Sequence, residues 1–316
     1  MAAGSKKVIY AALIGNALIA VTKFGASMVT GSSAMLAEGI HSLVDTGNQG
    51  LLLYGLHRAK RPADDKFPFG YGKEVYFWSF VVAILIFALG SGISLYEGVL
   101  HIVHPEPVES PMINYIVLSL ALVFEGGAWF FAFKAFSAAK GKWSYMEAVQ
   151  RGKDPTIFMV LFEDSAAVLG LVVAFLGIWL GQVTGLSYLD GVATVIIGLI
   201  LGATAVWLAY ETKGLLIGES ANREVVQDIR KLADGYPEIR HVNEVLTMHM
   251  GPEFILVNVS VDFQDGLSSE QVESTVAKID QHIKEAHPRV KRIFIEAEKR
   301  RQHIREVSHN PSGGSP

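Results

Sequence analysis

The sequence contains no cysteine, and only 18% of its residues are charged. The absence of cysteine excludes disulfides and thiolate metal sites, so any metal ion must be held by histidine, carboxylate or other nitrogen and oxygen donors. The low charge content and the mean hydropathy of +0.33 are atypical of a soluble protein of 316 residues. We therefore expect a membrane protein with a soluble portion. The first residues show no small-residue cleavage pattern, so we expect no removed signal peptide.

Apolar runs long enough to cross a bilayer occur six times along the chain. They cover residues 7–28, 33–56, 75–103, 112–136, 156–181 and 188–210. Lysines precede the first span, and lysines and arginines fill the loops after the second and fourth spans, whereas the other three loops have neither. By the positive-inside rule, the basic loops and both termini face the cytoplasm. We predict an all-α, six-helix transmembrane domain over residues 1–217, and the compact loops favour a bacterial inner membrane.

The character of the chain changes after the sixth span. Helical periodicity is expected near 221–236 and 268–286, and alternating strands near 241–250, 254–263 and 290–297. The order α-β-β-α-β predicts a cytoplasmic α+β domain over residues 218–299, an open-faced sandwich with helices on one side of a sheet. So small a domain buries little surface alone and gains stability by dimerising. The polar tail, residues 300–316, is predicted to be disordered.

A polar patch interrupts the second span. His41 and Asp45 are four residues apart, so a helix places them on one face, where an imidazole nitrogen and a carboxylate oxygen can bind one cation. Ionisable groups at membrane depth cost roughly 2.5 to 3.5 kcal/mol each by insertion scales and mostly mark binding or transport sites. This pair therefore predicts a metal site inside the membrane.

The fifth span supplies further carboxylates, Glu163 and Asp164. Neighbouring helical positions differ by about 100°, so we expect one of the two to be a ligand and the other to cap, pair or carry protons. Glu125 in the fourth span and Asn16 in the first are additional oxygen donors, as is Asn48, seven residues after His41.

Taken together, these motifs resemble the cation diffusion facilitator family of zinc transporters, nearest the branch that contains mammalian zinc transporter nine. The resemblance rests on the six spans, the cytoplasmic α-β-β-α-β order and three stretches of sequence. These are EGIHSLVDTGNQG at 38–50, FGYGKE at 69–74 and LFEDSAAVLG at 161–170.

The resemblance implies a homodimeric transporter that moves zinc out of the cytoplasm in exchange for protons by alternating access. His41, Asp45 and Asp164 match three ligands of the family's intramembrane site, but the fourth position falls at Val160, which cannot coordinate a metal. Glu163 is the first choice for the missing ligand, with Glu125, Asn16 or a water as alternatives.

Ligand chemistry couples metal and protons, because imidazole and carboxylates bind a cation only when deprotonated. An ordinary histidine has a pKa near 6.5, which places that competition at His41 within physiological pH. Manganese, cobalt or iron export remains an alternative to zinc export. A non-transporting membrane scaffold with a degenerate site is the other alternative. No enzyme motif and no nucleic-acid partner are expected.

Overall fold

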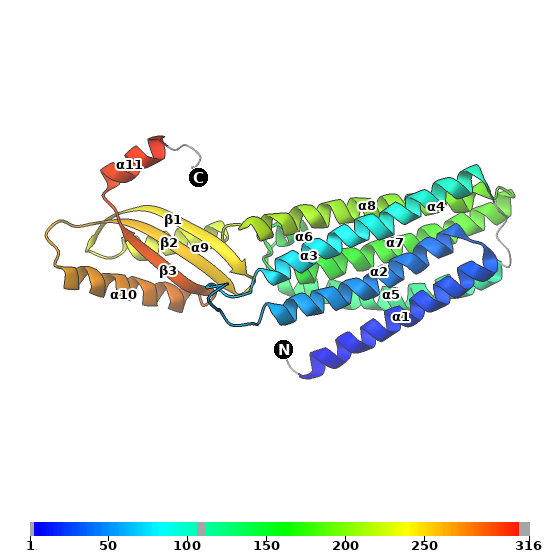
Figure 1. Ribbon diagram of the computed structural model, residues 1–316, viewed down its shortest axis with the longest axis horizontal. Helices are drawn as coiled ribbons and strands as arrows, with labels where there is room; N and C mark the ends of the chain where they lie inside the picture. Colours follow the sequence, from blue (N-terminus) through cyan, green and yellow to red (C-terminus); the bar gives the residue numbers. More distant parts are fainter. Residues whose placement is uncertain (1–2, 106–110, 310–316) are drawn as a thin grey trace. The chain divides into compact units, whose positions relative to one another are not determined.

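The computed structural model describes residues 3–105 and 111–309. The chain divides into two compact units. The first contains the residues up to 60 together with 74–213, and the second contains 61–73 together with the residues from 214 onward. Figure 1 shows the first unit as a bundle of long helices and the second as a small sheet with helices.

Each of the six predicted spans lies in a long helix. The helices are α1 Ala3–Thr30, α2 Ser33–Arg58, a continuous segment of α3 Glu74–Leu85, the π-helix η1 Ile86–Ser91 and α4 Gly92–Val103, then α5 Pro111–Ala139, α7 Pro155–Thr184 and α8 Tyr188–Ile217. A short helix, α6 Tyr145–Arg151, lies between α5 and α7. Within the described residues, four stretches are long and apolar enough to cross a membrane by themselves: 74–103, 112–138, 158–184 and 188–217. The polar residues of α2 lower its hydropathy, although the helix itself is 26 residues long.

A buried aspartate of α8 holds the start of α2. Asp190 Oδ2 accepts the backbone N–H groups of Ser33 at 2.7 Å and Ala34 at 3.3 Å, and its Oδ1 accepts the Ser32 hydroxyl at 2.8 Å. Ser32 is itself the N-cap, because its hydroxyl accepts from the N–H of Met35. The first N–H groups of a helix have no intrahelical partner, and a negative charge there is favourable. This network fixes where α2 begins, and therefore the depth of the polar face that follows.

Glycines bring α4 close to α8. A Cβ built on Gly98 would lie 2.7 Å from the backbone nitrogen of Val195, and one on Gly191 would lie 2.8 Å from the Gly98 carbonyl oxygen. Such close backbone approach is the usual means by which apolar helices associate in lipid. Immediately before this contact, the Ser91 hydroxyl of η1 donates to the Gly198 carbonyl oxygen at 2.8 Å. π-Helical turns inside α-helices occur frequently at functional sites.

The second unit has the predicted α-β-β-α-β order. Its elements are α9 Arg223–Asp234, β1 Ile239–Gly251, β2 Phe254–Phe263, α10 Ser269–Ala286 and β3 Val290–Ala297. The sheet order is β1-β2-β3, with β1 and β2 antiparallel and β2 and β3 parallel. Because parallel strands require a crossover, α10 connects β2 to β3. Ser268 and Gln271 form the capping box of α10.

One face of this sheet is covered by helices, and the other exposes apolar side chains although it also carries the buried Ser260 and Asp262. Alternate valines of β2, namely Val257, Val259 and Val261, are fully buried with Ile229 of α9 and Ile279 of α10. On the remaining face, the apolar side chains of Leu246, Met248 and Phe294 are exposed. The open-faced sandwich predicted from the sequence is therefore present.

The tail that the sequence predicts to be disordered contains one further helix. Residues Arg300–His309 form helix α11, and residues 310–316 lie outside the described residues. Two contacts anchor this helix: the Arg300 N–H donates to Asp262 Oδ2 at 3.3 Å, and His303 Nδ1 lies 3.0 Å from Glu298 Oε2. Composition alone gave no sign of these partners, because they lie at the end of the sheet.

Candidate functional site

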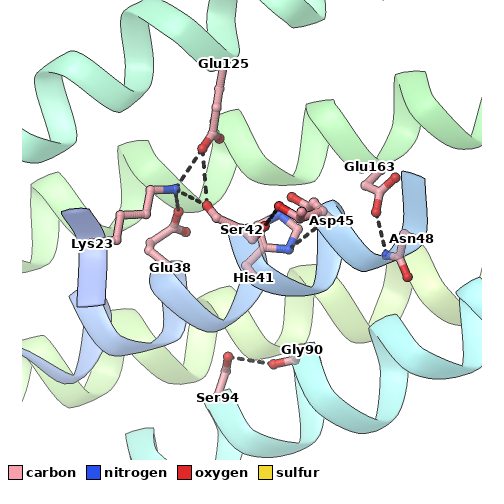
Figure 2. Close-up of polar contacts among 11 residues, drawn as sticks. Lys23, Glu38, His41, Ser42, Asp45, Asn48, Gly90, Ser94, Glu125 and Glu163 are labelled. Atoms are coloured by element: carbon pink, nitrogen blue, oxygen red, sulfur yellow. Dashed lines mark hydrogen bonds and ion pairs between the residues drawn. The ribbon is translucent and has the colours of Figure 1, made fainter. Parts of the chain in front are cut away.

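The polar residues of the second span form one stripe along α2. Glu38, His41, Asp45 and Asn48 follow one another at intervals of three, four and three residues, which keeps them on one face. Their exposed fractions are 0%, 1%, 8% and 1%. At 1.5 Å per residue the stripe is about 15 Å long. Figure 2 shows its two groups of partners, one around Glu38 and one around Asp45 and Asn48.

The second group brings α2 against α7. Asn48 Nδ2 donates to Glu163 Oε1 at 2.6 Å, and the carboxyl groups of Asp45 and Glu163 are within hydrogen-bonding reach of each other. His41 Nδ1 lies 3.4 Å from Asp45 Oδ1. Neither ring nitrogen of His41 nor Asp45 Oδ1 has a hydrogen-bond partner among the described residues, and all three atoms are buried. Buried polar atoms are normally paired, so these atoms require an explanation.

The adjacent acids of α7 differ in environment. Glu163 is 4% exposed and faces α2, whereas Asp164 is half-buried but close enough to feel the charges of Glu163 and Glu125. The expectation that the two point in different directions agrees with this difference. Val160, at the position where the resemblance implies another ligand, packs against the apolar core.

The side chains of His41, Asp45, Glu163 and Asp164 are neighbours, but their donor atoms do not surround a single point. Within the described part of the chain, no three histidine, aspartate or glutamate side chains are arranged so as to hold a metal ion. What the geometry provides is a buried imidazole, two facing carboxyl groups and a third carboxyl group one residue further along α7. These are nitrogen and oxygen donors of the kind that bind divalent transition metals.

Two sequence comparisons bear on this site. Residues 9–217 match the cation efflux transmembrane domain, and residues 221–300 match the cytoplasmic domain of cation efflux proteins. The chain belongs to the cation efflux family.

Curated relatives of this cation efflux protein include the human proton-coupled zinc antiporter SLC30A9, mitochondrial, which is 34% identical over 82% of the chain and 46% of the relative. Metal tolerance protein C4 of Arabidopsis thaliana is 29% identical over 82% of the chain and 57% of the relative. The cation-efflux pump FieF of Klebsiella pneumoniae is 24% identical over 88% of the chain and 91% of the relative. The chain thus spans about half the length of the first two relatives.

The remaining oxygen donors considered from the sequence have other surroundings. Glu125 Oε1 accepts from the ammonium group of Lys23 at 2.8 Å and therefore already has a cationic partner. Asn16 is half-buried on α1, seven residues before Lys23. Lys23 of this cation efflux protein was not predicted from the sequence to take part in a site, although a lysine inside an apolar span is itself a signal of a buried partner.

Asp64 stabilises the conformation of the loop before α3. Asp64 Oδ1 accepts the Phe67 N–H at 2.7 Å, and its Oδ2 accepts the Tyr71 hydroxyl at 2.6 Å. These bonds stabilise the charged form, so the pKa of Asp64 is lowered from its ordinary value. The carboxylate closes a turn of the loop. A Cβ built on Gly72, at the end of this loop, would lie 2.3 Å from the Met250 carbonyl oxygen of β1.

Proposed function

We propose that this cation efflux protein exports a divalent metal ion, zinc by preference, in exchange for protons. His41, Asp45, Glu163 and Asp164 are the proposed ligands. The observation that carries the proposal is that buried atoms of His41 and Asp45 have no hydrogen-bond partner among the described residues, while the Asp45 carboxyl group lies within reach of that of Glu163. An imidazole with two or three carboxylates can form the tetrahedral arrangement that suits zinc.

The carboxyl pair supports proton exchange. Asp45 and Glu163 lie within hydrogen-bonding reach, and two carboxyl groups can hydrogen-bond only if one carries a proton, because ionised carboxylates are acceptors only. A divalent ion requires both in the ionised form. Metal binding therefore releases the proton, and metal release on the far side allows a proton to return.

Transport also requires the site to open to each side in turn. The ligands come from α2 and α7, so rocking of these helices against the rest of the bundle exposes first one mouth and then the other. The π-helical turn η1 is the proposed hinge, since it interrupts the long helix that continues into the glycine contact with α8.

Orientation follows from the basic loops. We propose that all six long helices cross the membrane, with both termini in the cytoplasm. The second unit then forms a cytoplasmic domain, and its open face with Leu246, Met248 and Phe294 suits the dimerisation expected of this family domain. The compact loops favour a bacterial inner membrane.

The test is zinc uptake into proteoliposomes with a zinc-sensitive dye and a pH-sensitive dye inside. We expect His41→Ala and Asp45→Ala to reduce uptake to the level of empty vesicles, since each removes a buried ligand. His57→Ala is the matched control, because His57 lies in the last turn of the same helix and uptake should be unchanged. Transport by either ligand variant at the wild-type rate would refute the site.

The same vesicles separate the remaining alternatives. Proton movement opposite to zinc supports exchange, and zinc uptake without it would refute exchange while leaving export intact. Manganese, cobalt or iron, offered singly and in competition with zinc, tests the preference. A scaffold predicts no uptake of any of these ions, and an enzyme predicts none either.

A further inference from the structure

A second polar cluster occupies the other end of the α2 stripe. Lys23 of α1 is completely buried, and its ammonium group donates to Glu38 Oε2 at 3.1 Å, to Ser42 Oγ at 2.8 Å and to Glu125 Oε1 at 2.8 Å. An ammonium group has three donors, so all of them are used. Three side-chain oxygens from α2 and α5 thus surround one cationic centre, as Figure 2 shows.

The cluster contains two carboxyl groups for one ammonium group. Lys23 contributes one positive charge against the carboxyl groups of Glu38 and Glu125. The second oxygens of those groups, Glu38 Oε1 and Glu125 Oε2, are buried and have no hydrogen-bond partner among the described residues. These two oxygens are therefore coordinating positions that the single ammonium group does not use. Oxygen donors in excess of one charge are a feature of sites for divalent cations.

The cluster is next to the proposed transport site. Ser42 directly follows His41. Glu38 precedes His41 by three residues, which corresponds to a rise of about 4.5 Å along the helix. A divalent ion that enters the bundle therefore meets two sets of carboxyl groups along the polar face of α2: Glu38 with Glu125 of α5, and Asp45 with Glu163 of α7. Only the lysine distinguishes the first set from an additional cation site.

We propose that Lys23 is a tethered cation that fills a second cation position and confines the transported ion to His41, Asp45 and the acids of α7. The inference rests on the proposed transport function and deepens it. The lysine acts as a positioning residue: it does not touch the transported ion, but it prevents Glu38 and Glu125 from competing for that ion.

The contact of Glu38 with α7 supports the positioning role of Lys23. A Cβ built on Gly170 of α7 would lie 2.3 Å from Glu38 Oε1. The carboxylate is thus enclosed between the ammonium group of α1 and the bare backbone of α7, seven residues after Glu163. Once the ammonium is removed, both oxygens of Glu38 remain where a metal ion could use them.

The test counts bound ions in the purified full-length protein by equilibrium dialysis against Zn²⁺. The wild type is expected to bind about one ion per chain and Lys23→Gln about two, because the vacated oxygens become ligands. Lys23→Gln combined with Glu125→Gln should return the count to one. Lys134→Gln, which removes an exposed lysine of α5, is the matched control and should also bind one.

A third variant assigns the sites. Lys23→Gln combined with His41→Ala should retain one ion, held at Glu38 and Glu125, although it does not transport. An unchanged count of one in folded Lys23→Gln would overturn the inference. A wild type that binds no zinc would instead overturn the proposed function.

If Lys23→Gln is unstable, the dependence of its folding on Zn²⁺ also tests the inference. If this variant is obtained folded only when Zn²⁺ is present during purification, with two ions bound, the metal has replaced the ammonium group as the inference requires. If it fails to fold with and without Zn²⁺ while the Lys23→Gln, Glu125→Gln double variant folds, Lys23 serves only to neutralise charge and the inference is wrong.

Discussion

Asn48 offers a sharp test of how the metal site is held together. Its amide donates to Glu163 Oε1 at 2.6 Å across the contact between α2 and α7, and its side chain is 1% exposed. Asn48→Ala removes this donor and leaves all four proposed ligands in the sequence. We expect the helices to keep their packing and Glu163 to lose its fixed orientation.

The size of the effect follows from the bond. A hydrogen bond to a charged group contributes about 1.5 to 3 kcal/mol, and each 1.4 kcal/mol corresponds to about a tenfold change in dissociation constant. Loss of a residue that orients a metal ligand commonly weakens metal binding by about 10- to 100-fold. We therefore expect Asn48→Ala to weaken zinc binding by about 10- to 100-fold, with a similar rise in the zinc concentration for half-maximal uptake.

The assay is zinc titration by calorimetry on detergent-solubilised protein, followed by uptake into proteoliposomes. Thr46→Ala is the matched control, because the Thr46 hydroxyl donates to a carbonyl oxygen of its own helix, that of Ser42, at 2.8 Å. It should change the dissociation constant less than about threefold, as expected for a local bond. If folded Asn48→Ala binds zinc as tightly as the wild type, Glu163 is not oriented in the way described or is not a ligand.

Two further predictions concern the packing around the site, and thermal unfolding in detergent checks both. Gly170→Ala places a Cβ against Glu38 Oε1 and should lower the free energy of unfolding by about 1 to 3 kcal/mol. Gly126→Ala, whose Cβ meets no described atom within 4 Å, is the control and should be neutral or stabilising. Equal effects of the two substitutions would contradict the close contact at Gly170. Asp190→Ala leaves the first N–H groups of α2 unpaired and should cost about 2 to 3 kcal/mol. Asp190→Asn keeps one acceptor oxygen and should cost less than half as much, and an equal loss would mean that the charge alone matters.

Helical spacing made part of the site predictable. His41 and Asp45 were expected on one face because they are four residues apart, and the structure places them 3.4 Å apart by their nearest polar atoms. The glutamate and aspartate of α7 were expected to diverge because adjacent helical positions do, and Glu163 alone is buried against α2. Their roles as ligands remain predictions.

The partner of each buried charge was not predictable in the same way. Lys23 and Glu125 are 102 residues apart, and their contact depends on how α1 and α5 are rotated about their axes. Helix α11 was missed for a related reason, since its anchors, Asp262 and Glu298, become neighbours only when the sheet has formed.

The amino-acid sequence by itself determined the long apolar segments, the order of elements in the second unit and which polar residues share a helix face. Periodicity and turn chemistry act over a few residues, so they can be read locally. The tertiary structure decided which helix faces meet: Asn48 with Glu163, Lys23 with both glutamates, and Asp190 with the start of α2. Those pairings depend on helix rotation and depth, which many distant packing contacts determine together.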